Sequence, residues 1–198
     1  MKFTQVAEDM FSKLQLNAGV VLTDFNPATG TLDKTKILGA TSGGVNFTAQ
    51  AEFRDDGEDI DNIPSNALEL KHIDYYTVTL SGTMKTVDTA AAKALIGAAT
   101  VSGEKVTPNA DVASTDFADI WWVGDYSDVN TGNSAGFVAI RVLNAYSTGG
   151  FQLQSNDNGK GDFAFEFTGH YSIEDMEIHP FEVYVKAGAN GSTGTTGA

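Results

Sequence analysis

Three groups of residues in this sequence have types and spacing that could support catalysis or ion binding. Residues 132–136 match the G-x-S-x-G nucleophile elbow, with Ser134 at the position of the nucleophile. That motif works when a strand precedes the serine and a helix follows it. Here residues 128–132 are turn-like and residues 137–143 have a strand pattern. The segment is therefore predicted to be a hairpin loop, and a hydrolase using Ser134 is only a distant alternative.

The second group is acidic: Asp55, Asp56, Glu58, Asp59 and Asp61. Calcium takes six to eight oxygen ligands, but the run lacks the Gly and Glu spacing of an EF-hand loop. Solvated loop carboxylates are the favoured interpretation.

The third group is the histidines, His72, His170 and His179. Because the chain has no cysteine, a zinc site would need these residues together with carboxylates. His170 falls on the polar side of a predicted strand, and His179 precedes Pro180 at a strand entry. We expect no metal site, no cofactor and no enzymatic activity.

Charge restricts the classes of function. The chain has 26 acidic and 12 basic residues, for a net charge of -14. Proteins that grip nucleic acid present a basic surface to the phosphates, so DNA binding is not expected. A channel through which DNA slides without sticking remains compatible with this charge. No apolar run approaches the roughly 20 residues of a membrane span, and residues 1–5 do not resemble a secretory signal.

The elements that must position these residues are mostly strands. Apolar and polar residues alternate over residues 45–53, 76–84 and 163–173, which is typical of half-buried antiparallel strands. Residues 117–126, 137–145 and 181–186 are predicted as further strands, with 18–25 as one more. Trp121 and Trp122 would then point to opposite faces, leaving one of them to pack under a loop or against a partner.

One helix and several connections complete the predicted organisation. Asp88 can cap a helix over residues 89–98, and a weaker helical pattern covers residues 4–14. Asn158-Gly159 is a strong hairpin signal, and Gly149-Gly150 marks another break. Residues 55–67 are long for a hairpin connection. Residues 1–17 are predicted as an N-terminal arm, and residues 188–198 as a flexible Gly/Ser/Thr tail after a single domain spanning 1–187.

Five stretches carry a resemblance to a known family. Asn17-Ala-Gly-Val-Val-Leu-Thr-Asp-Phe25 and Gly39-Ala-Thr-Ser-Gly-Gly-Val-Asn-Phe47 resemble the N-terminal part of major tail proteins of long-tailed phages of Gram-positive bacteria. Gly57-Glu-Asp-Ile-Asp-Asn62, Leu68-Glu-Leu-Lys71 and Thr77-Val-Thr-Leu-Ser-Gly-Thr83 extend the similarity. The similarity is distinctive over residues 17–100 and continues more loosely to about residue 186.

The resemblance implies an antiparallel β-sandwich or barrel of the tail-tube type with one flanking helix. It also implies a structural subunit of the virion tail, made in the host cytoplasm. Such subunits form hexameric rings that stack into a tube for DNA ejection. Tape-measure protein and tail assembly chaperones act during assembly, and terminator and distal tail proteins close the tube ends. DNA passes through the lumen without specific binding, and no membrane is involved.

The resemblance also suggests roles for particular residues. The long loop of such subunits contacts the neighbouring ring, and its counterparts here are Asp55, Asp56, Glu58, Asp59, Ile60, Asp61, Ile63 and Pro64. The lumen-facing candidates are the polar sides of two strands: Asn46, Thr48, Gln50 and Glu52, and Thr77, Thr79, Ser81 and Thr83. Two alternatives remain open. One is the inner tube of a contractile tail or phage-derived bacteriocin; the other is an extracellular β-sandwich that binds carbohydrate through Trp121 or Trp122.

Overall fold

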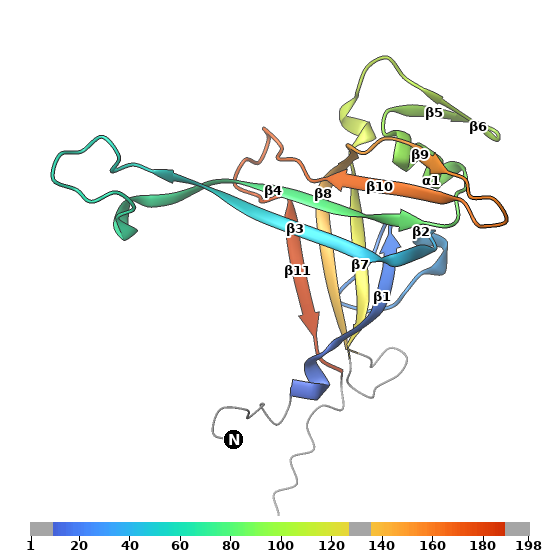
Figure 1. Ribbon diagram of the computed structural model, residues 1–198, viewed down its shortest axis with the longest axis horizontal. Coiled ribbons are helices and arrows are strands. Elements are labelled where there is room, and N and C mark those ends of the chain that lie inside the picture. The colour runs from blue at the N-terminus through green and yellow to red at the C-terminus, as the bar shows by residue number, and fades with distance from the viewer. Residues whose placement is uncertain (1–9, 127–135, 189–198) are drawn as a thin grey trace, which may run out of the picture.

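The fold is mainly β, with antiparallel sheets and one α-helix (Figure 1). The computed structural model describes residues 10–126 and 136–188. The strands of these residues are β1 (Gln15–Leu22), β2 (Ile37–Gly39), β3 (Thr41–Asp55), β4 (Lys71–Met84), β5 (Ala99–Ser102), β6 (Lys105–Pro108), β7 (Ala118–Tyr126), β8 (Phe137–Ser147), β9 (Gln152–Gln154), β10 (Asp162–Thr168) and β11 (Phe181–Lys186). The helix α1 spans Thr89–Ile96, and short 3-10 turns occupy Met10–Lys13, Lys34–Lys36, Leu68–Leu70 and Ser114–Asp116.

Nine strands form one bent sheet. Its order is β2-β1-β7-β8-β10-β4-β3, with β11 paired to β8 and β9 paired to β10. Strand β8 joins the two halves: it pairs with β7 and β11 over most of its length and with β10 only at Tyr146 and Ser147. In Figure 1 the β3–β4–β10 half lies across one end of the upright half formed by β1, β7, β8 and β11.

The main core lies between these two halves. It contains Val78, Leu80 and Met84 from β4, Phe165 and Phe167 from β10, and residues of β1, β7, β8 and α1. A smaller core covers the other face of the upright half. There Phe25, from the connection after β1, packs edge-on against Trp121 and Phe137. The upright half is thus covered on both faces, whereas the β3–β4–β10 half is covered on one.

The helix α1 closes one end of the main core. Asp88 caps it as the sequence predicts, its carboxylate accepting the Ala91 N–H at 2.7 Å. Gly97 ends it with a φ of 84°, a conformation that favours glycine. The Ser147 hydroxyl donates to the Leu95 carbonyl at 2.6 Å, which fixes the helix to β8. None of the helices in the described ranges is long and apolar enough to cross a membrane.

Most predicted strands are present, but one prediction is wrong in extent. The alternation over residues 163–173 continues past the true end of β10 at Thr168. The strand ends just before Gly169, where a Cβ would lie 2.8 Å from the Pro180 carbonyl oxygen, so the close approach of the two backbones requires glycine. Ile173, predicted to be apolar and inward-facing, is 91% exposed. The strands β2, β5, β6 and β9 have only three or four residues each, too few to produce a readable alternation.

Candidate functional site: a polar sheet face and a projecting arm

The eight polar residues predicted to share a surface are brought together by the pairing of β3 with β4. Asn46 lies opposite Ser81, Thr48 opposite Thr79, and Gln50 opposite Thr77. Side chains of directly paired residues point to the same side of a sheet. Glu52 and Thr83 continue the alternation at the two ends. These eight residues are called the polar face below.

The polar face continues over β10. Glu166 pairs with Ser81, and Thr168 pairs with Thr79. The Thr148 hydroxyl joins both of these β10 side chains, at 3.1 Å from Glu166 and 2.8 Å from Thr168. Sequence reasoning missed this extension. The alternation of β10 was visible, but its pairing with β4 is a long-range contact that no local pattern specifies.

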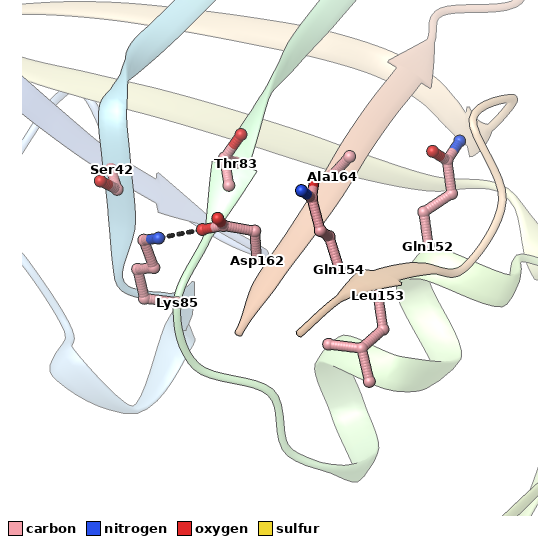
Figure 2. A pocket seen from close by; sticks show the side chains of 8 residues that line it. All are labelled: Ser42, Thr83, Lys85, Gln152, Leu153, Gln154, Asp162 and Ala164. Atoms are coloured by element: carbon pink, nitrogen blue, oxygen red, sulfur yellow. Dashed lines mark hydrogen bonds and ion pairs between the residues drawn. The ribbon is translucent and has the colours of Figure 1, made fainter. Parts of the chain in front are cut away.

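A pocket of about 410 Å³ lies at the end of the polar face where β3 begins and β4 ends (Figure 2). Its lining includes Gln152 and Gln154 from β9. Lys85 donates to the Asp162 carboxylate in this pocket, and that hydrogen bond lowers the pKa of Asp162. The ion pair is neutral overall, so the pocket offers hydrogen bonds without a net charge.

The reverse side of the polar face is the main core. Val78, Leu80 and Met84 alternate with the polar residues of β4 and are fully buried. Burial therefore fixes which side of the sheet is polar. A one-residue slip would exchange the two sides, so the register is strongly specified.

Among the described residues, β3 has no partner strand along its outer edge, and neither has the three-residue β9 on the other side, where β10 also pairs with β8 at Phe167 and Thr168. In the order β9, β10, β4, β3, the outer strands each pair on one side only. The β3 edge is long, with 15 residues and no proline. An unpaired edge exposes backbone N–H and C=O groups that can pair with another chain.

The outer end of the β3–β4 hairpin leaves the body as an arm, residues 52–75 (Figure 1). The register shifts between Glu52 and Phe53, where β4 carries one extra residue. Phe53 and Ile73 are 57% and 47% exposed, so the arm has left the core. At its root the Tyr76 N–H donates to the Tyr171 hydroxyl at 2.8 Å, and the Tyr76 ring packs edge-on against Phe181.

The loop at the tip of the arm is held by its first carboxylate. Asp55 accepts the Gly57 N–H at 2.9 Å and the Asn66 N–H at 2.8 Å. These two hydrogen bonds lower the pKa of Asp55, because they favour the ionised form. The carboxylate thus ties both ends of the loop together.

Asp56 also has a local role. It pairs with Arg54 at 2.7 Å, and this hydrogen bond is the largest cause of its lowered pKa. His72 lies 3.7 Å away and adds to the same effect. Asp55 and Asp56 are thus solvent-accessible carboxylates that also make hydrogen bonds and an ion pair within the arm.

The remaining loop residues differ in how far their side chains are exposed to solvent. Glu58, Asp59 and Asp61 are exposed, as are Ile60 and Pro64. Ile63 is half-buried instead. It turns toward Gly57, which is itself buried, and a Cβ at Gly57 would lie 2.7 Å from Leu70 Cδ1, so that side chain would have to shift. The loop thus has a small interior of its own and presents an isoleucine between carboxylates.

The other candidate catalytic and metal-binding residues do not form a site among the described residues. Ser134 lies outside the described residues. Within residues 10–126 and 136–188, no three His, Asp or Glu side chains come together as metal ligands would. His170 is not in a strand; its ring packs against Phe117, and Nδ1 lies 3.1 Å from the Asn144 carbonyl. His72 and His179 lie on the arm and at its root.

The two tryptophans point to opposite faces of β7, as predicted. Trp121 belongs to the smaller core and is 5% exposed. Trp122 packs against the main core, and its indole N–H donates to the Ala18 carbonyl at 2.9 Å. Neither ring offers the open aromatic platform that sugar binding requires.

In comparisons with known proteins, no family model and no curated protein matches this sequence.

Proposed function

We propose that this chain is a structural subunit of a phage tail tube, with the polar face lining the lumen and the arm contacting the next ring. The observation that carries the proposal is a half-sheet that is polar on one side, core-packed on the other and unpaired along the 15-residue edge of β3. A sheet of this kind becomes a channel wall when copies join edge to edge, since closure leaves no strand unpaired.

A channel built in this way would be wide enough to hold water. Each copy contributes four strands, β9, β10, β4 and β3. Six copies, the number implied by the resemblance, would make a barrel of about 24 strands, and barrels of 16–18 strands already enclose water-filled channels.

The wall has chemistry suited to passage rather than to binding. From Asn46 to Gln50 on β3, and from Thr77 to Thr83 on β4, the polar face carries hydroxyls and amides but no charge. Glu52 and Glu166 add negative charge, and the Lys85 cation is paired with Asp162. With a net charge of -14 on every subunit, the lumen would repel phosphate, so DNA would slide over a hydrated surface.

The arm supports the stacking part of the proposal. It projects beyond the body and ends in a loop whose shape is set internally by Asp55. Ile60 and the carboxylates beside it remain available to a neighbouring ring. Tape-measure protein, chaperones and the proteins at the tube ends are the further partners that this role requires.

The packing of Trp121, which is buried, and of Trp122, which is half-buried and bonded to Ala18, weighs against the carbohydrate-binding alternative. The proposal covers both a long flexible tail and the inner tube of a contractile one.

Electron microscopy of the purified protein tests the proposal directly. We expect rings with a central hole and, at high concentration or with an initiator complex, tubes of stacked rings. A protein that stays monomeric at every concentration, with and without initiator, would refute it.

A further inference from the structure

The two ends of the β3–β4 hairpin differ in their chemistry. At one end Asp55 pairs with Lys71, and the acidic loop of the arm joins the two strands. At the other end Ser42 pairs with Thr83, beside the pocket shown in Figure 2. Strand β3 has 15 residues, so the loop and the pocket are on the order of 40 Å apart. Within one copy they therefore cannot touch each other.

Three carboxylates of the loop are available to another molecule. The side chains of Glu58, Asp59 and Asp61 are exposed, and they make no hydrogen bond or ion pair with any other described residue. From Asp55 to Leu70 the loop has no basic residue that could neutralise them. These three side chains, called the loop carboxylates below, are strong acceptors for donors on another molecule.

The pocket offers hydrogen-bond donors of the kind that a carboxylate needs. The side chains of Ser42, Thr83 and Gln154 line it and form no hydrogen bond with another described residue. Lys85 has three N–H donors and uses one of them on Asp162. Figure 2 shows these side chains together with their ion pair. A carboxylate that entered this pocket, called the acceptor pocket below, would meet hydroxyl, amide and ammonium donors.

Glycines leave space beside the acceptor pocket. A second hollow, of about 350 Å³, shares Ser42 and Thr83 with it and extends over Gly43 and Gly44. A Cβ at either glycine would meet no atom of the described residues within 4 Å. The two hollows together are open to a loop rather than to a single side chain.

Charge favours a meeting of these two ends. The Lys85–Asp162 pair is neutral, and Asn156 donates to both Asp162 and the Lys160 carbonyl, which holds the Lys160 turn beside the pair. Asp157 balances Lys160 in that turn. The pocket end is therefore close to neutral. In a chain with a net charge of -14, such an end repels an acidic loop less than an average surface would.

We propose that the loop carboxylates of one copy bind in the acceptor pocket of a copy in the next ring. The choice of a second copy as the occupant rests on the proposed tube function. Copies that all point the same way along the stack present the loop end of one hairpin to the pocket end of the next, in a head-to-tail contact that repeats. The stacking of rings does not specify the residues that receive the loop, whereas this contact does.

Charge reversal tests the contact. Gln154→Glu places a carboxylate in the acceptor pocket, so it should abolish tubes and leave single rings at concentrations where the wild type forms tubes. Gln154→Asn, which keeps the amide, is the matched control and should still form tubes. Adding Asp59→Lys and Asp61→Lys to the Gln154→Glu chain should restore the tubes. Normal tubes from Gln154→Glu alone, or a loss that the two lysines do not relieve, would overturn the contact and leave the tube function standing.

Cross-linking tests which ends meet, and the chain contains no native cysteine to interfere. A chain with both Asp59→Cys and Gln154→Cys, treated with a short bismaleimide, should give a ladder of covalent oligomers in tubes and none in unstacked rings. Neither single variant should give a ladder, because the contact joins unlike ends.

A ladder from unstacked rings, or from either single variant, would overturn the contact. So would tubes of the double variant that give no ladder. A wild-type protein that never forms tubes would refute both this contact and the tube function on which it rests.

Discussion

At the scale of single residues, the polar face is distinguished by what it lacks. An ordinary solvent-exposed strand surface carries Lys and Glu, whereas Thr48 and Thr79 stand opposite each other among hydroxyls and amides. β-propensity explains threonine in strands in general but not the shortage of charge. If DNA passes over this surface, as proposed, the shortage of charged side chains has a reason, because cations there would bind the phosphates.

Replacing Thr48 and Thr79 with lysine tests this reason. A ring of twelve cations facing DNA phosphates should slow ejection from normally assembled virions by roughly tenfold or more at low salt, and added salt should relieve the effect. Thr48→Asn with Thr79→Asn is the neutral control. Unchanged ejection by the lysine variant at low salt would remove these residues from the channel wall.

Asp55 allows a second prediction at this scale. Its pKa is lowered by the hydrogen bonds from Gly57 and Asn66, so it stabilises the folded loop above the ordinary carboxyl pKa. That contribution is lost as the pH falls through the lowered value. Loop order, followed by amide hydrogen exchange at Asn66, should therefore survive mild acid and fail in stronger acid. Asp55→Asn should speed that exchange at neutral pH, and equal exchange in both proteins would contradict the assigned role.

At the scale of elements, the arm is the part that leaves the body. Its loop residues contribute nothing to the main core, whose members lie between the two sheet halves. Deleting residues 58–64 should leave the melting temperature within about 4 °C of wild type. It should also abolish tubes while preserving single rings in electron micrographs. Glu58→Gln, Asp59→Asn and Asp61→Asn together separate loop charge from loop length.

A collapsed melting transition after this deletion would show that the loop belongs to the folding unit. Tubes of normal length would show that stacking depends on another surface.

Sequence patterns predicted the strands of the site better than the contacts between residues that are distant in the sequence. Alternation over residues 45–53 and 76–84 gave the two polar sides, because one side of each strand is buried by the core. The internal use of Asp55 could not be predicted, since its partner Asn66 is eleven residues away across a folded loop.

At the scale of the whole molecule, net charge and the open strand edge have opposite effects on the association of copies. A net charge of -14 keeps copies apart in solution, while an open 15-residue strand edge favours association. Such a balance favours ordered growth from an initiator over random aggregation.

The projecting hairpin also has a mechanical consequence. A pull on the loop along the hairpin would reach the body through β4, whose six pairs with β10 lie side by side along the line of force. Those pairs would be loaded together in shear rather than opened one after another. In the proposed tube, copies stacked through this hairpin would resist extension along the tube and would still allow it to bend under lateral load.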